Sequence, residues 1–196
     1  MHFLLNKGGL YKVYNGNLLY HGCVPLKEDG NLKSVRIFGR AYKGKGLYEV
    51  LESYVRKGFY AMDPKEKERG KDIMWYIWLS ENSPLFGKDK MATFERYFLA
   101  EKETHKEKKN PYYLLLEDEK VVEKILKEFG LENEDAHIIN GHVPVKCKDG
   151  ENPVKCGGKV LVIDGGFSKA YQKETGIAGY TLIYNSYGLI LAAHKP

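Results

Sequence analysis

In residues 118–142, DEKVVEKILKEFGLENEDAHIINGH, the apolar residues first follow a helical spacing and then form a strand-like run. Apolar residues recur at helical spacing from about Asp118, and Gly130 is a residue type that commonly ends a helix. The following run, AHIINGH at 136–142, has the composition of a buried strand. This stretch therefore predicts a helix and then a strand, and the strand delivers His142 at its end.

Further strands are predicted on both sides of this unit. The runs LYKVYN at 10–15 and LLYHGC at 18–23 meet across an Asn-Gly-Asn turn, which is a strong hairpin signal. Three more strand-like runs follow the central unit: KVLVIDGG at 159–166, AGYTLIYNS at 178–186 and GLILAAHKP at 188–196. Strands at both ends around a helical middle predict an α/β core with a helical insertion.

The middle of the chain has helical spacing. Three segments carry it: GLYEVLESYVRKGFYA at 46–61, DIMWYIWLS at 72–80 and MATFERYFLAE at 91–101. We expect a single domain over 1–196, with residues 1–34 and 118–196 as the α/β core and residues 35–117 as a mainly helical insertion. An apolar run at 112–116 precedes the central helix.

Composition limits the function classes. Hydrophobic residues make up 43% and aromatic residues 13%, which is too rich in core-forming side chains for a disordered segment. The net charge of +5 comes from basic clusters mixed with glutamates, which suits a small anionic substrate better than a nucleic-acid groove. No apolar run approaches eighteen residues, so we expect a cytoplasmic protein without membrane or nucleic-acid partners.

Two histidines stand at predicted strand ends beside glycine. His21 ends the run LLYHGC and His142 ends IINGH. Two neutral imidazoles on adjacent loops suit a divalent cation if carboxylates complete its shell, although strand-end histidines are also common as hydrogen-bonded structural residues. Asp164 ends an apolar run before two glycines, where it either lines a site or only reverses the chain. His137 forms a formal Asp-x-His pair with Asp135.

Five long segments taken together resemble the later part of the class 3 fructose-1,6-bisphosphatases of Firmicutes, in the calcineurin-like metallophosphoesterase superfamily. The segments are NGNLLYHGCVPL at 15–26, NSPLFGKDKMATFERYF at 82–98, ETHKEKKNPYY at 103–113, IINGHVPVK at 138–146 and GGKVLVIDGGFSKAYQKETGIAGYTLIYNSYGL at 157–189. The resemblance implies part of a β-sandwich flanked by helices, with a helical insertion.

The resemblance also implies a two-metal centre, with manganese as the metal. The family's roles carry over onto His21 and His142, which would bind the second metal. Pro144 stands where many members have a further histidine. The Asp-x-His, Gly-Asp-x-x-Asp-Arg-Gly and Gly-Asn-His blocks that would supply the other ligands are not convincingly present. We therefore expect a C-terminal fragment with an incomplete site, inactive alone and dependent on an N-terminal half of the same enzyme.

The resemblance implies that the full enzyme is a phosphoric monoester hydrolase. It would remove the 1-phosphate of fructose 1,6-bisphosphate in gluconeogenesis. The second phosphate would need basic residues, for which Arg96, Lys88 and Lys146 are the candidates, with Asp164 also in the substrate site. Arg96 is preferred among them because a guanidinium binds phosphate in a bidentate manner. The alternatives are a surface role for these residues, and a non-catalytic sugar-phosphate binding module or split subunit for the chain.

Overall fold

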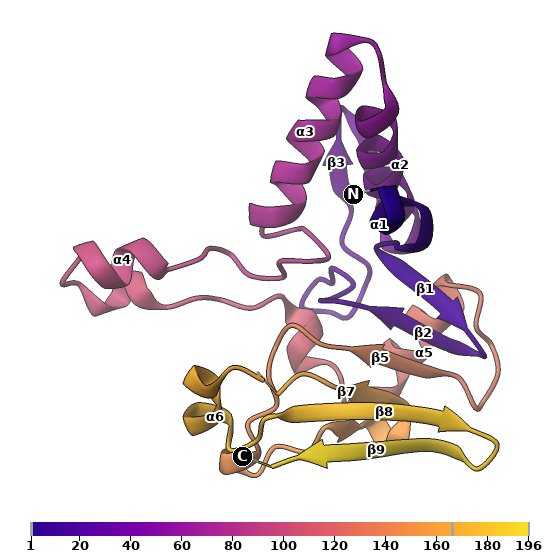
Figure 1. Ribbon diagram of the computed structural model, residues 1–196, viewed down its shortest axis with the longest axis vertical. Coiled ribbons are helices and arrows are strands. Elements are labelled where there is room, and N and C mark those ends of the chain that lie inside the picture. The colour runs from indigo at the N-terminus through magenta and orange to yellow at the C-terminus, as the bar shows by residue number, and fades with distance from the viewer. Residues whose placement is uncertain (1, 166, 196) are drawn as a thin grey trace.

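The computed structural model describes residues 2–165 and 167–195, and these form a mixed α/β fold, as the sequence predicts. Gly166, the second glycine of the turn expected after Asp164, lies outside the described residues. The main sheet has five strands in the order β1-β2-β5-β7-β6 (Figure 1). Their bounds are Tyr11–Tyr14 for β1, Asn17–Tyr20 for β2, His137–Asn140 for β5, Val160–Val162 for β7 and Val154–Lys155 for β6.

Three central strands of this sheet run in the same direction. β2 pairs with β5 and β5 pairs with β7, both in parallel, whereas β1 and β6 are antiparallel edge strands. The carboxyl ends of β2, β5 and β7 therefore meet at one edge of the sheet. This edge is the place where ligands bind in many open α/β sheets.

The predicted hairpin and central helix are both confirmed. Asn15 and Gly16 connect β1 to β2 with φ angles of 48° and 75°, the positive values that a tight two-residue hairpin turn requires. Helix α5 (Glu119–Glu128) begins after Asp118, whose carboxylate accepts the backbone N–H groups of two first-turn residues. Gly130, with a φ of 82°, follows its end.

The core lies between α5 and the parallel strands. Leu18, Ile138 and Val160 form one cross-strand row, and each is fully buried. They belong to the same hydrophobic cluster as Val122 and Ile125 of α5. The apolar stripe of the helix thus packs on one face of the short strands and helps to stabilise them.

A helical hairpin stands over one end of the sheet (Figure 1). It consists of α2 (Gly44–Tyr60) and α3 (Pro64–Leu79), so both helices predicted between residues 46 and 80 are confirmed. The carboxylate of Asp63 caps the first turn of α3. The two helices share a second hydrophobic cluster with a small hairpin, β3 (Val35–Ile37) and β4 (Arg40–Tyr42), which sequence periodicity did not predict.

An arm extends away from the rest of the chain between residues 88 and 109 (Figure 1). It contains α4 (Thr93–Phe98) and the 3₁₀ turn η1 (Lys102–His105), and an isolated antiparallel bridge between Lys88 and Lys109 closes its base. α4 is shorter than the helix predicted at 91–101 and buries none of its residues. A helix with no surface to pack on is not stabilised beyond its intrinsic propensity, which accounts for the difference.

The remaining elements are short or terminal. A second two-stranded sheet, β8 and β9, confirms two of the predicted tail strands, and it joins the main core through Tyr180. The apolar run at 112–116 begins in a 3₁₀ turn. The bounds are β8 (Gly179–Asn185), β9 (Gly188–His194), α1 (His2–Lys7), α6 (Lys169–Thr175), η2 (Pro111–Leu114), η3 (Cys147–Asp149) and η4 (Cys156–Gly158).

Two further expectations concern membrane spans and the division of the chain into a core and an insertion. Across residues 2–165 and 167–195, no helix is both long and apolar enough to cross a membrane. The division into a core of 1–34 and 118–196 and a mainly helical insertion of 35–117 stays a prediction.

Candidate functional site

The candidate site lies at the carboxyl edge of the three parallel strands. His21 directly follows β2, while His142 and Asp164 each come two residues after the ends of β5 and β7. Backbone hydrogen bonds hold these segments together: the Gly141 N–H donates to the His21 carbonyl at 2.9 Å, and the Val145 N–H donates to the Asp164 carbonyl at 2.9 Å. The parallel pairing thus brings together three side chains that are far apart in the sequence.

The two imidazoles face each other. His21 Nε2 lies 3.0 Å from His142 Nδ1, and the ring centroids are 4.9 Å apart. His142 Nε2 lies 2.8 Å from the carbonyl oxygen of Phe86. Because a carbonyl only accepts, His142 Nε2 carries the hydrogen, so its Nδ1 holds the lone pair and accepts from His21 Nε2.

The backbone at His142 is strained. Its φ is 68°, in the left-handed region that a residue with a Cβ adopts at a cost of about 1–3 kcal/mol. The turn is fixed on its N-terminal side, where the Asn140 side-chain amide donates to the Gly22 carbonyl at 3.1 Å. Strain of this kind persists when the surroundings determine the conformation, and here it aims the imidazole at Phe86 and His21.

The surroundings of His142 favour its neutral form. Burial lowers the pKa of the His142 imidazole below its usual value, and electrostatic interactions with His21 and Lys88 lower it further. The hydrogen bond to Phe86 and the charge of Asp164 act on this pKa in the opposite direction, without reversing the shift. A neutral imidazole with its Nδ1 lone pair exposed to a partner is the form that binds a metal ion.

The histidine pair fits two positions of a metal shell and no more. Two nitrogens about 2.1 Å from one ion lie roughly 3 to 3.4 Å apart, which is close to the observed separation of 3.0 Å. The contact between His142 and Phe86 is the kind of outer hydrogen bond that orients metal-binding histidines. Within residues 2–165 and 167–195, however, no three His, Cys, Asp or Glu side chains are placed to hold an ion.

Asn140 is a further polar residue of this edge that the sequence did not single out. It is the last residue of β5 and is only 2% exposed. Its side-chain oxygen has no hydrogen-bond partner among the described residues. Buried acceptors are rarely left unpaired in folded proteins, so this oxygen is a candidate to contact a water or ligand. A polar residue directly before Gly141-His142 was the available signal.

The predicted phosphate-binding residues occupy different surroundings. Lys88 and Arg96 share one carboxylate, Glu107, at 3.0 Å and 3.6 Å. Burial raises the pKa of Glu107, but its bonds with Lys88 and the Ala92 N–H outweigh this and hold it below the usual value. Lys146 is exposed just beyond the His142 turn. Of these three basic residues, Lys88 at the base of the arm acts on His142 through its charge, whereas Arg96 lies farther along the arm in α4.

Lys109 is a basic residue that sequence reasoning missed. It is paired with Lys88 across the bridge at the base of the arm. Partial burial lowers the pKa of its ammonium group; Glu151 opposes that effect, and the charges of Lys146 and Lys88 add to it. Its position opposite Lys88 depends on a pairing over twenty-one residues, which no local pattern indicates.

The other histidines make contacts away from the strand edge. His137 of the Asp-x-His pair contacts the side chain of Asn17 at 3.2 Å, at the opposite end of β5 from His142. His105 contacts the Leu99 carbonyl at 2.9 Å, and His194 contacts the Thr181 hydroxyl at 2.7 Å. His2 packs edge-on against an aromatic ring of α2. His21 and His142 are thus the two described histidines whose rings meet.

Comparisons with known proteins agree on one family. The model of the family "Firmicute fructose-1,6-bisphosphatase" matches residues 1–196. A class 3 fructose-1,6-bisphosphatase of Clostridium botulinum is 60% identical over 195 residues, and a protein of the same name from Clostridioides difficile is also 60% identical. The match covers 99% of this chain but 29% and 30% of those relatives. No solved structure matches the chain.

Proposed function

Because this chain belongs to the family of Firmicute fructose-1,6-bisphosphatases, we propose that it forms part of a metal-dependent phosphatase acting on fructose 1,6-bisphosphate. The reaction would be hydrolysis of the 1-phosphate, in the cytoplasm, as a step of gluconeogenesis. The proposal includes membership of the calcineurin-like metallophosphoesterase superfamily, with the five-stranded sheet as part of its β-sandwich. The observation that supports it most is the His21–His142 pair at the carboxyl edge of that sheet.

The two histidines would hold one cation of a dinuclear manganese centre. When bound, such ions polarise the phosphoryl oxygens and lower the pKa of a coordinated water. His142 would bind through Nδ1, because Phe86 holds its other nitrogen as a hydrogen-bond donor. His21 would bind the same ion through Nε2 in the tautomer that carries its hydrogen on Nδ1, so the metal would replace the hydrogen bond to His142.

The basic residues would bind the phosphate that is not cleaved. Lys146 and Lys88 are the better placed of the predicted residues, since the charge of Lys88 already acts on His142. Arg96 would contribute only if the arm carries it toward the substrate, and it would have to exchange Glu107 for the phosphate. Asp164 would contact the sugar hydroxyls, since its side chain lies at the strand edge, within 4 Å of the place that a Cβ on Gly141 would occupy.

The remaining metal ligands would come from another polypeptide segment. Among the described residues, the strand edge offers two imidazole nitrogens, and no group of three His, Cys, Asp or Glu side chains is placed to hold an ion. The chain spans less than a third of the length of its curated relatives, and a segment equivalent to their remaining part is the natural source of the missing ligands. An N-terminal half of the same enzyme is therefore the proposed partner.

The experiment measures phosphate release from fructose 1,6-bisphosphate with manganese. The chain is assayed alone and after co-expression with the part of the Clostridium botulinum relative that lies outside the match. We expect turnover only from the combination. Rapid turnover by the chain alone, or its absence from a stable combination, would contradict the proposal.

The incomplete donor set favours a second candidate function, a non-catalytic sugar-phosphate binding module or split subunit. Lys88, Lys109 and Lys146 would then bind a sugar phosphate without metal. Calorimetry of the chain with fructose 1,6-bisphosphate in the presence of a chelator separates the two candidates. Binding that resists the chelator, together with no activity in the combination, would favour the module.

A further inference from the structure

An apolar groove lies between the N-terminal helix and the helical hairpin. It has a volume of about 780 Å³ and is bounded by α1, α2 and α3. Its lining is mostly apolar and includes Leu4, Val55, Phe59, Met74, Trp75 and Trp78. The side chains of Trp75 and Trp78 are 69% and 67% exposed, although tryptophan is usually largely buried. Soluble proteins rarely leave so large an apolar surface uncovered unless it binds something.

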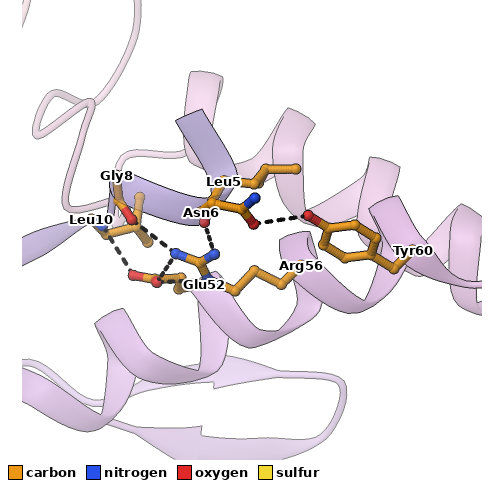
Figure 2. Close-up of polar contacts among 7 residues, drawn as sticks. All are labelled: Leu5, Asn6, Gly8, Leu10, Glu52, Arg56 and Tyr60. Carbon is orange, nitrogen blue, oxygen red and sulfur yellow. Dashed lines mark hydrogen bonds and ion pairs between the residues drawn. The ribbon is translucent and has the colours of Figure 1, made fainter. Parts of the chain in front are cut away.

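The wall formed by α1 is held by a polar clamp on α2 (Figure 2). The guanidinium of Arg56 donates to the carbonyl oxygens of Leu5 and Gly8 and pairs with Glu52 at 2.6 Å. Glu52 in turn accepts the Leu10 N–H at 3.1 Å. A six-residue helix with no buried residue is not stable by itself, so these bonds are what keep α1 in place beside the groove.

The opposite wall is fixed by close contact between two helices. Gly58 of α2 and Gly70 of α3 touch so closely that a Cβ built on Gly70 would lie 2.5 Å from the Gly58 Cα. This contact sets the spacing of the helical hairpin on which Trp75 and Trp78 stand. Contacts within the chain therefore hold the walls of the groove in place, which lowers the ordering cost of accepting an occupant.

The groove is connected to the histidine site by one short segment. Leu85 lines the groove, and the carbonyl oxygen of the next residue, Phe86, accepts a hydrogen bond from His142 Nε2. On the other side of Leu85, the Pro84 carbonyl accepts the N–H of Cys23, two residues after His21. A polypeptide docked in the groove would thus lie against the same segment that orients the candidate metal ligand.

We propose that the groove binds an amphipathic segment from the part of the family polypeptide that lies outside the 195 matched residues. The inference rests on the proposed function, in which that part also supplies the missing metal ligands. More than two thirds of each relative lies outside the match, which is ample chain to cover the groove and reach the histidines.

The charged residues at the border of the groove indicate which kind of segment it would bind. Lys67 and Lys71 border the groove, and neither has an ion-pair partner in the part of the chain that the structure describes. Arg56 is already satisfied by Glu52. An apolar face flanked by aspartate or glutamate complements this arrangement. In a twofold dimer a second copy would present the same lysine-bordered groove, which provides no such complement.

The test is co-purification of the chain with the unmatched part of the Clostridium botulinum relative. Four forms are compared: the unmodified chain, the double variant Trp75→Ser/Trp78→Ser, His142→Ala, and Tyr187→Ser. Tyr187 is 93% exposed in the turn between β8 and β9 and serves as a matched control for loss of a surface aromatic. Far-ultraviolet circular dichroism checks that each variant is folded.

We expect the unmodified chain, His142→Ala and Tyr187→Ser to associate equally, and the double tryptophan variant to bind at least about 100-fold more weakly. Equal association of the double variant, or no association of any form, would overturn the inference. Self-association of the chain alone that the double variant abolishes would identify a second copy as the occupant and would also overturn it. Undiminished activity of the His142→Ala combination would contradict the proposed function alone.

A spectroscopic measurement locates the contact. Trp75 and Trp78 are the only tryptophans of the chain, so labelling it with 5-fluorotryptophan gives two ¹⁹F signals. We expect both signals to shift on addition of the unmatched part of the relative. Binding that leaves both signals unchanged would place the interface elsewhere and refute the proposed groove.

Discussion

The strand edge and the groove differ in what they lack. At the strand edge, the imidazoles of His21 and His142 are oriented by polar contacts within the chain, and the missing elements are charged ligands. In the groove, the polar clamp of Arg56 is satisfied, and the missing element is apolar cover for Trp75 and Trp78. Under the two proposals, the strand edge takes an ion and the groove takes a polypeptide, so a single docked segment would complete both.

The largest expected effect is a loss of activity at the strand edge with little change in the stability of the fold. His142→Gly removes one of the two proposed metal ligands and should reduce phosphate release by the combined polypeptides at least about 100-fold. Glycine also relieves the backbone strain at a φ of 68°, which offsets the lost hydrogen bonds. We therefore expect the free energy of unfolding to change by less than about 1 kcal/mol.

The control for this variant is His137→Ala, because His137 lies at the other end of the same strand. It should retain most of the activity. Equal losses in the two variants, measured as phosphate release at saturating manganese, would show that the strand edge has no special role.

The next effect concerns the groove. Gly70→Ala would force a Cβ against the backbone of Gly58 and should destabilise the fold by about 2–3 kcal/mol. Gly46→Ala is the matched control, since a Cβ there meets nothing within 4 Å and the residue is helical. The control should be stabilising by up to about 1 kcal/mol. Urea unfolding measures both, and similar values for the two would mean that the helix contact is not tight.

A smaller effect is expected from the groove's border. Lys67→Glu/Lys71→Glu should weaken association with the unmatched part of the relative by about tenfold at low salt, and added salt should reduce the difference. Lys57→Glu/Lys65→Glu makes the same change of charge at one residue of α2 and one of α3, neither of which is part of the groove lining. Tighter binding by the Lys67/Lys71 variant would show that the occupant carries basic rather than acidic flanks.

The smallest effect is a pH dependence at the base of the arm. The pKa of Glu107 is held below its unfolded value, so its contribution to stability is present above the usual glutamate pKa and is lost as the pH falls through the folded value. Glu107→Gln should lack this part of the acid-induced loss, about 1 kcal/mol or less. Unfolding measured between neutral and acidic pH detects the difference, and parallel curves for both proteins would contradict it.

Local signals explain which elements the sequence could predict. The Asn15-Gly16 turn, the Asp118 cap and Gly130 each specify their structure through a few neighbouring residues, and all three are confirmed. The β3–β4 hairpin and α6 were missed because their strands and helix are short and give little periodicity. The helix around Thr93 was predicted too long because the helical pattern gave no information about whether anything covers it.

The candidate site was predictable only in part. A glycine beside each histidine indicated that His21 and His142 stand at strand ends. Their contact, across 121 residues of sequence, depends on the parallel pairing of β2 with β5, and no local pattern encodes it. The same holds for Phe86, which fixes the tautomer of His142, and for Lys109, which joins Lys88 across the base of the arm. Long-range pairing is what converts separate residues into a site.

The measurement that tests the central claim most directly is titration of the chain with Mn²⁺, followed by paramagnetic broadening of its imidazole NMR signals. His21 and His142 should lose their signals at the lowest manganese concentrations, before His105 and His137. The double variant His21→Ala/His142→Ala should show no such selective broadening. Broadening that starts at other histidines, or that is the same in the double variant, would contradict a metal site at the strand edge.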